Sequence, residues 1–164
     1  MTKQPFADKT ELARAARLFL PPGTVCELRA LNALVPGLNG RYPCKTLTGY
    51  FDDADRLVAE AGRIQSATGC YVTLNPVDPR LLARAQNRLV VGERGTATGD
   101  GHIVRRRFLL IDADAQRPAG ISASGDEHEA AKKRARSIYA HLKAAGWPDP
   151  VVADSGNGCH LLYF

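Results

Sequence analysis

Two short segments of the sequence carry residues that can do chemistry. Residues 108–114 read Phe-Leu-Leu-Ile-Asp-Ala-Asp, an apolar run that ends in the carboxylates Asp112 and Asp114. In a strand, residues two apart project to the same face, so the two carboxylates should lie side by side. Like charges held this close repel each other, and a bound divalent cation offsets that repulsion. Because hard oxygen ligands favour Mg²⁺ or Mn²⁺, the pair predicts a metal site at Asp112 and Asp114.

The second segment, residues 155–160, reads Ser-Gly-Asn-Gly-Cys-His. Its glycines, Gly158 among them, allow the backbone to turn tightly and to approach a ligand. Ser155, Asn157 and the loop amides could donate hydrogen bonds to phosphate oxygens, and the imidazole of His160 could bind a triphosphate. The alternative is an ordinary β-hairpin, because Asn-Gly is a strong turn signal by itself. The two interpretations are compatible, since a hairpin can carry the histidine.

Together the segments suggest metal-dependent nucleotide chemistry. A two-metal site lowers the barrier for attack of a 3′-hydroxyl on an α-phosphate. The Asp-x-Asp pattern is short, however, and also occurs by chance. The same carboxylate pair fits a nuclease or another phosphotransferase as well as a polymerase.

The composition is that of a folded protein with a net positive charge. Its 164 residues are enough for one domain, or for a large piece of one, and 45% of them are hydrophobic. The net charge of +5 is compatible with a polyanionic partner. Arg105 and Arg107 stand just before the acidic strand, where we expect contact with phosphate or template. The basic residues of the helix that follows are expected on a solvated face.

The cysteines and the apolar runs indicate a cytoplasmic location. None of Cys26, Cys44, Cys70 and Cys159 belongs to a C-x-x-C pair, which favours reduced packing residues over a zinc site. The first residues hold no apolar signal core. The longest apolar runs are too short to span a bilayer, so we expect no membrane association.

Hydrophobic periodicity predicts strands that alternate with helices. Helices are expected over 8–20, from Asp52 or Asp53 to about 68, over 79–88, and from Ser124 to about 145. Strands are expected over 24–31, 45–51, 70–75, 103–111, 150–153 and 159–164. This alternation predicts an α/β (α+β) fold with a mixed β-sheet packed against helices, in which strand order and direction stay open.

The order of these motifs resembles a known family. A hydrophobic strand with Asp-Ala-Asp is followed by Arg-Pro-Ala-Gly-Ile-Ser-Ala, a helix, Gly-Trp-Pro-Asp-Pro, and Asp-Ser-Gly-Asn-Gly-Cys-His-Leu-Leu-Tyr. This order is similar to that of the catalytic domain of the archaeo-eukaryotic primase superfamily, in particular the primase-polymerases of plasmids, phages and bacterial mobile elements. The specific match covers about residues 104–164. Residues 1–103 look like the N-terminal α/β portion of the same proteins.

The resemblance implies a DNA-dependent nucleotidyltransferase of replication. Asp112 and Asp114 would ligate the catalytic Mg²⁺ or Mn²⁺, and His160 would contact the phosphates of the incoming nucleotide, with Ser155, Asn157 and Gly158 in the loop leading to it. The substrates would be a DNA template-primer and nucleoside triphosphates, and a helicase would act in cis or in trans.

The family also has a third acidic motif well downstream of the histidine, which these 164 residues do not hold. We therefore expect residues 1–164 to be the N-terminal portion of the catalytic domain, with its RRM-like unit incomplete. Two alternatives remain open. One is a non-catalytic DNA-binding or replication-initiation module, and the other is a different metal-dependent phosphotransferase or nuclease.

Overall fold

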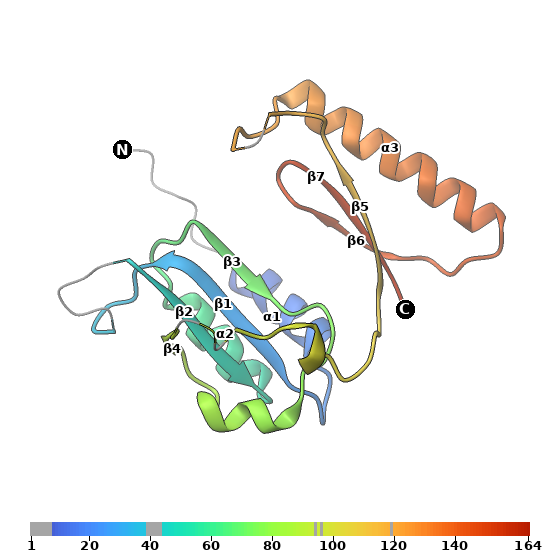
Figure 1. Cartoon of the computed structure of the whole chain (residues 1–164). Helices are drawn as coiled ribbons and strands as arrows, with labels where there is room; N and C mark the ends of the chain where they lie inside the picture. Colours follow the sequence, from blue (N-terminus) through green and yellow to red (C-terminus); the bar gives the residue numbers. More distant parts are fainter. Residues whose placement is uncertain (1–7, 39–43, 94, 96, 119) are drawn as a thin grey trace. The chain divides into compact units, whose positions relative to one another are not determined.

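The computed structural model describes residues 8–38, 44–93, 95, 97–118 and 120–164 (Figure 1). The chain divides into two compact units, residues 1–106 and 107–164. Both units combine helices with antiparallel sheet, which confirms the predicted α+β class. The pairings between strands are all antiparallel, and the described part of the chain adds one isolated parallel bridge, between Tyr50 and Gln86. The strands form two sheets where one mixed sheet was expected.

The first unit is built on a four-stranded sheet with the strand order β3-β1-β2-β4. Its elements are α1 (Lys9–Phe19), β1 (Cys26–Ala33), β2 (Lys45–Phe51), α2 (Ala54–Gly62), β3 (Gly69–Val72), the 3₁₀ helix η1 (Pro79–Arg84), β4 (Val90–Val91) and the 3₁₀ helix η2 (Asp100–His102). Helices α1 and α2 pack on one face of the sheet, where Leu20 and Leu57 join the apolar residues Leu28 and Phe51 of the strands. The side chains of η1 pack with Tyr50 in a separate cluster.

Two predicted helices are shorter in the structure because tertiary pairing competes with helical propensity. Helix α2 begins after Asp53, whose side chain accepts hydrogen bonds from the next amides, but it ends at Gly62 and does not reach residue 68. The amide of Gln65 instead donates to the carbonyl of Leu34 at 2.9 Å. Similarly, the segment 79–88 forms only the 3₁₀ helix η1, because the chain after it bonds to both backbone groups of Tyr50.

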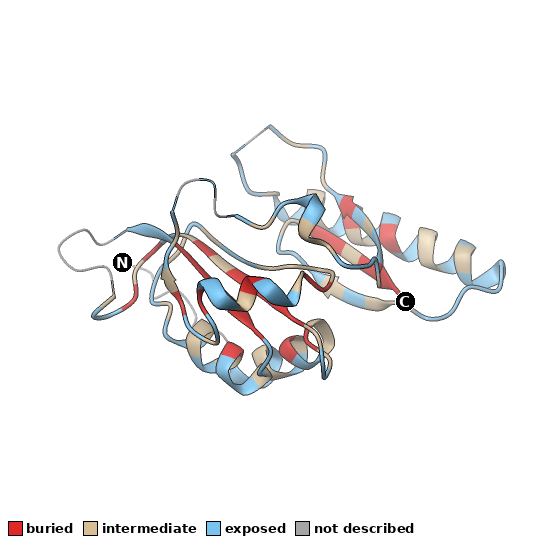
Figure 2. Cartoon of the chain, turned by 60° about the horizontal axis from the view of Figure 1, so that its bottom comes forward, coloured by how far each residue is buried: buried red, intermediate tan, exposed pale blue. Residues whose placement is uncertain are grey.

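The second unit is a three-stranded sheet covered by one long helix. Its elements are β5 (Leu109–Asp114), α3 (Gly125–Ala144), β6 (Val151–Asp154) and β7 (Gly158–Tyr163), and β7 is the central strand in the order β5-β7-β6. Helix α3 packs on one face of this sheet through Ala135, against Ala113, Cys159 and Leu161. Figure 2 shows the buried residues on the strands and on one side of the long helix.

Both ends of α3 follow the signals in the sequence. Ser124, where the helix was expected to begin, accepts from the amide of Glu127, and the Glu127 carboxylate accepts from the amide of Ser124, which forms a capping box. At the other end, Gly146 adopts φ +85, and the amides of Gly146 and Trp147 donate to the carbonyls of Lys143 and Leu142. This is the Schellman arrangement, which glycine favours because it adopts the left-handed region without strain.

The acidic strand differs from its prediction in position and burial. Strand β5 covers Leu109–Asp114 and not 103–111, so the two aspartates lie inside the strand. Ile103 instead pairs with Val77 in the first unit. The strand was expected to be buried, yet Leu109 and Leu110 are 50% and 41% exposed. Within the described ranges, no helix has the length and apolar character needed to cross a membrane.

Candidate functional site

The strand register of the second unit brings the two predicted motifs together. Asp112 on β5 lies directly opposite His160 on β7, and Asp114 lies opposite Gly158. Residues opposite each other across an antiparallel pair share a face, so both carboxylates and the imidazole lie on one face of the sheet. The residues between them, Ala113 and Cys159, belong to the core with α3, as the alternation of strand side chains requires. The predicted pairing of Asp112 and Asp114 on one face is therefore confirmed.

Each carboxylate lies beside a basic side chain. His160 Nε2 lies 3.3 Å from Asp112 Oδ1, and Arg117 Nη2 lies 3.3 Å from Asp114 Oδ2. The aspartate side chains remain 54% and 50% exposed, so both also face solvent. The protein thus offsets the repulsion between the two carboxylates with one basic side chain for each.

A pocket of about 520 Å³ runs along the open edge of β5, beside the first half of α3. Its lining joins the acidic strand and the helix: Asp112, Ala113, Asp114, Ala115, Gln116, Glu127, Ala130, Ala131 and Arg134. Three of the lining residues carry carboxylates and one carries a guanidinium, and the space is large enough for a small polar ligand. A cation near the aspartates and an anion near Arg134 would both meet opposite charge there.

The donors in this pocket fit a hard divalent cation only in part. No group of three or more His, Cys, Asp or Glu side chains that could hold a metal occurs among the residues that the structure describes. Asp112 and Asp114 can supply carboxylate ligands. Mg²⁺ is commonly held by one or two carboxylates, with water and substrate phosphates completing its shell. The pair fits a cation that is bound together with a phosphate-bearing substrate.

The predicted glycine loop is a hairpin turn whose polar groups bond within the protein. The hydroxyl of Ser155 accepts from the Gly158 amide at 2.9 Å, and the Ser155 amide donates to the Gly158 carbonyl at 3.1 Å. The side-chain oxygen of Asn157 accepts from the Ala123 amide at 2.9 Å. The hairpin interpretation is confirmed, and Asn157 ties the turn to the segment that precedes α3. Nucleotide binding by Ser155 and Asn157 stays a prediction.

Gly158 has a steric role that the sequence did not reveal. A Cβ at this position would stand 2.3 Å from the carbonyl oxygen of Ala113 on β5. Such a contact is far inside van der Waals distance, so only glycine lets β7 approach β5 here. The close approach places His160, two residues later, in register with Asp112.

Asp154 belongs to a different cluster. Its carboxylate accepts from the Gly156 amide at 2.7 Å and lies 2.9 Å from Nε2 of His128 on α3. The bond from the Gly156 amide lowers the pKa of Asp154, and the contact with His128 adds to this effect. Asp154 pairs with Cys159, so it lies on the sheet face that α3 covers, opposite to the aspartate pair. Through its contact with Asp154, His128 joins α3 to β6.

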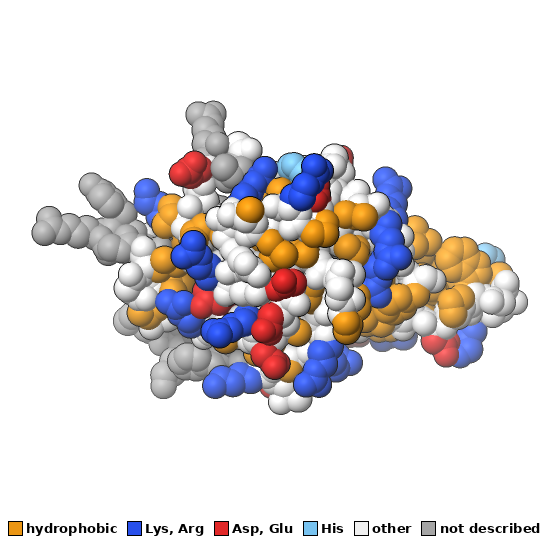
Figure 3. Space-filling model, turned by 90° about the horizontal axis from the view of Figure 1, so that it is seen from below, with side chains coloured by type: hydrophobic (Ala, Val, Ile, Leu, Met, Phe, Trp, Pro, Cys, Tyr) orange, Lys and Arg blue, Asp and Glu red, His pale blue; other side chains and the backbone are white. Residues whose placement is uncertain are grey.

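The two predicted nucleic-acid contacts, Arg105 and Arg107, belong to different units. Arg105 is exposed in the segment that ends the first unit. Arg107 lies near the start of β5, where its guanidinium stacks 5.3 Å from the centre of the Phe108 ring. The basic side chains visible in Figure 3 are interspersed with acidic and apolar ones. Template contact by Arg105 and Arg107 stays a prediction.

Three side chains near the pocket were missed by sequence reasoning. Glu127 was not singled out as a residue of a site, and Arg134 belongs to the helix whose basic residues were expected on a solvated face. Arg117 begins the Arg-Pro-Ala-Gly-Ile-Ser-Ala segment, but its contact with Asp114 depends on the path of the loop after β5 and could not be predicted. The spacing of Glu127 and Arg134, seven residues apart on one helix face, could have indicated that they border the same groove.

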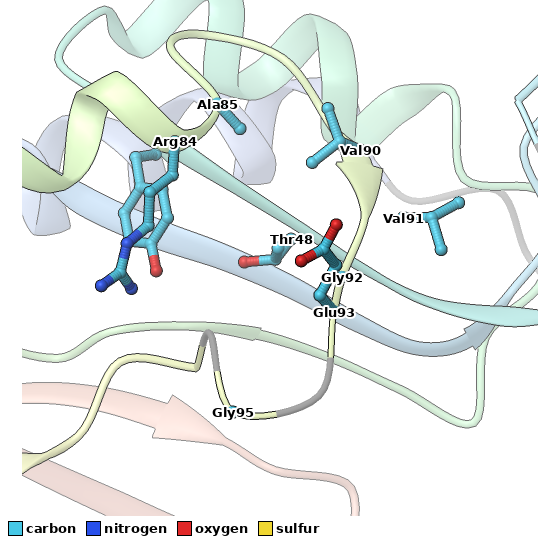
Figure 4. A pocket seen from close by; sticks show the side chains of 9 residues that line it. Thr48, Arg84, Ala85, Val90, Val91, Gly92, Glu93 and Gly95 are labelled. Carbon is cyan, nitrogen blue, oxygen red and sulfur yellow. The ribbon is translucent and has the colours of Figure 1, made fainter.

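A second pocket, of about 350 Å³, lies in the first unit. Figure 4 shows Arg84 on one side of it, Val90 and Val91 on the other, and Thr48 between them. The Thr48 hydroxyl donates to Glu27, a carboxylate that is 2% exposed and is also bound by Arg29. Arg29 and Thr48 thus compensate the buried Glu27 carboxylate within the sheet, which is typical of a structural ion pair. Because the lining of this pocket holds a single carboxylate, Glu93, and no histidine, it does not resemble the aspartate site.

Comparisons with known proteins add no relative. No family model matches the chain, and neither a curated protein nor a solved structure matches it significantly.

Proposed function

We propose that this chain carries part of the catalytic site of a DNA-dependent nucleotidyltransferase of the primase-polymerase type, which makes or extends primers from nucleoside triphosphates. One observation supports the proposal above the others. Two carboxylates and a histidine from separate sequence motifs share a sheet face, with Asp112 opposite His160, beside a pocket of about 520 Å³. The resemblance of residues 104–164 to the archaeo-eukaryotic primase superfamily gives this arrangement its chemical interpretation.

Each side chain has a defined part in the proposed reaction. Asp112 and Asp114 would hold Mg²⁺ or Mn²⁺, which when bound stabilises the charge that develops at the attacked phosphate and on the departing pyrophosphate. His160 would donate a hydrogen bond to a phosphate oxygen and so orient the triphosphate. The amide-rich turn 155–158 would border the same phosphates. A template-primer would deliver the 3′-hydroxyl, with Arg105 and Arg107 on its backbone.

The proposal extends to the setting of the enzyme. The same resemblance implies a helicase partner, in cis or in trans, and plasmid, phage or mobile-element replication. The free cysteines Cys26, Cys44, Cys70 and Cys159 suit a reducing cytoplasm.

The decisive experiment combines binding with synthesis. Calorimetry should show Mn²⁺ binding to the wild-type chain, and Asp112→Asn and Asp114→Asn should each abolish it. Asp126→Asn is a matched control, because Asp126 is an exposed aspartate in the same unit and lies outside the pocket lining. Circular dichroism checks that each variant folds.

Labelled primer-template then separates the classes of enzyme. Incubated with deoxynucleoside triphosphates and Mn²⁺, a primase-polymerase site should extend the primer. Shortening of the primer in the absence of nucleotides would identify a nuclease. Salt-dependent DNA binding that proceeds without Mn²⁺ binding would identify a non-catalytic module and would overturn the proposal.

A further inference from the structure

Arg117 stands at the carboxylate site without being part of either sequence motif. It lies in the loop between β5 and α3, three residues after Asp114, and its side chain is only 19% exposed. Arginine is rarely buried to this degree unless its charge is compensated. Asp114 provides that compensation at 3.3 Å, and the Arg117 Nη1 group donates to the carbonyl of Ile121 at 2.6 Å.

The guanidinium keeps unused donor capacity. Its Nε atom is buried and has no hydrogen-bond partner among the described residues. The bond to Asp114 is long for a charge-assisted pair, which normally measures about 2.7–2.9 Å. The Arg117 guanidinium has one long contact with a carboxylate and one N–H group without a partner among the described residues. It is therefore suited to bind a second anion.

Arg117 also acts on the far wall of the pocket. Glu127 accepts from the Ser124 amide, which is the main reason that its pKa is lowered, and the positive charge of Arg117 lowers that pKa further. Arg117 therefore lies between two carboxylates that line the same pocket, Asp114 and Glu127. An anion that binds beside Asp114 Oδ2 would lie near the Arg117 guanidinium, whose Nη2 atom is 3.3 Å from that oxygen.

The charges imply a competition at Asp114. A divalent cation on the aspartate pair would be repelled by a guanidinium that contacts the same carboxylate. That repulsion is relieved when the guanidinium turns to a ligand with negative charge. A triphosphate supplies this charge, because it accompanies the cation and presents several acceptor oxygens.

We propose that Arg117 alternates between two partners: Asp114 in the free chain, and the polyphosphate of a nucleoside triphosphate once a cation occupies the aspartate pair. The identity of this ligand rests on the function proposed above. Arg117 is then a positioning residue that compensates the charge of Asp114 in the empty site and helps to bind the loaded substrate.

The first test compares two affinities of Arg117→Gln with those of the wild type. Loss of the competing charge should tighten Mn²⁺ binding roughly three- to ten-fold. Loss of a charged hydrogen-bond donor should weaken binding of the Mn²⁺-nucleoside triphosphate complex about ten-fold. Arg117→Lys, which keeps the charge but loses the fork, should leave Mn²⁺ affinity near that of the wild type and still weaken triphosphate binding.

The matched control is Arg136→Gln. Arg136 is a 66% exposed arginine of α3 that faces Glu129, so its removal should change neither affinity appreciably. If Arg117 only braces the loop through Ile121, its removal would lower both affinities or neither, and the proposal would be wrong.

A second test needs no metal. In the presence of a chelator, Asp114→Asn frees Arg117, so this variant should bind inorganic tripolyphosphate more tightly than the wild type. The gain should disappear in Asp114→Asn/Arg117→Gln. If the wild type binds no Mn²⁺, the proposed function fails, and the tripolyphosphate comparison alone then decides the role of Arg117. Equal tripolyphosphate affinity in the single and double variants would overturn it.

Discussion

At the scale of single residues, the carboxylate pair was predictable and its neighbours were not. Asp112 and Asp114 share a face because side chains alternate along a strand. Any two residues of a strand that are two positions apart do the same. The position of His160 opposite Asp112 depends on the register of β7 against β5. That register is set by the 155–158 turn and by the steric fit at Gly158, so the motif order alone could not give it.

The first prediction concerns His160. In the proposed function its imidazole contacts phosphate and does not hold the cation. His160→Ala should therefore weaken binding of a Mn²⁺-nucleoside triphosphate about ten-fold, the value for loss of one hydrogen bond to a charged group. Mn²⁺ affinity should change much less.

Calorimetry with Mn²⁺ alone and then with the complex provides the measurement. His141→Ala is the control, because His141 is an exposed histidine near the end of α3. Equal triphosphate affinity in wild type and His160→Ala would remove His160 from the site.

At the scale of elements, the bounds of helix α3 were predictable from the sequence and those of strand β5 were not. The capping box and the glycine stop are local signals, and both ends of α3 lie where they predict. The extent of β5 depends instead on which residues find partners. Residues 103–108 were expected to begin this strand, yet Ile103 pairs with Val77 of the first unit. Hydrophobic pattern cannot distinguish these two partners.

The second prediction tests the close approach of β7 to β5. Gly158→Ala would force a Cβ against the Ala113 carbonyl and should destabilise the second unit by about 1–3 kcal/mol. Trp147, the only tryptophan of the chain, packs 5.3 Å from the Tyr163 ring, so its fluorescence reports urea unfolding of this unit. Gly125→Ala should change stability little, because a Cβ there meets nothing within 4 Å. Equal midpoints for the two variants would contradict the steric argument.

The third prediction concerns acid. In the second unit, the Lys143 ammonium lowers the pKa of Asp149, and the Gly156 amide lowers that of Asp154. Carboxylates with folded pKa values below their unfolded value of about 4 stabilise the fold fully above that pH. Their contribution is lost as the pH falls below about 4 through the folded values.

Urea midpoints followed by Trp147 fluorescence should therefore decline on the acid side. In Asp149→Asn, which removes one of the titrating groups, the decline should be shallower. An identical acid-side slope in Asp149→Asn and wild type would show that the Lys143 contact does not form in solution.

At the scale of the whole molecule, composition predicted a folded α+β chain but not its division. The apolar content and the alternation of elements indicated one sandwich, whereas the strands form a separate sheet in each of two compact units. Periodicity reports which residues face a core, but it does not say which strands share it. The pairing of strands far apart in the sequence decides which strands share a core. This pairing is difficult to predict from a single sequence.

The fourth prediction uses the net charge of +5. DNA binding by this chain should weaken steeply with salt, with a slope of log K against log salt of about −0.9 for each phosphate neutralised. Fluorescence anisotropy with labelled duplex across about 50 to 200 mM salt measures this slope. Asp112→Asn should leave the slope unchanged, because in the proposed function that carboxylate holds the cation and does not contact the DNA backbone. Binding that does not vary with salt would refute an electrostatic contribution.

Each of the two cores contains a buried thiol, whose reactivity reports the opening of that core. Cys26 is fully buried in the first unit and Cys159 is 6% exposed in the second. Burial raises the pKa of Cys26 to about 12 and also raises that of Cys159, so both stay protonated and unreactive at neutral pH. A short pulse of a thiol alkylating reagent followed by peptide mass spectrometry would therefore time the opening of each core separately. Cys159 lies between Gly158 and His160, so its labelling rate measures how often the strand that carries His160 opens.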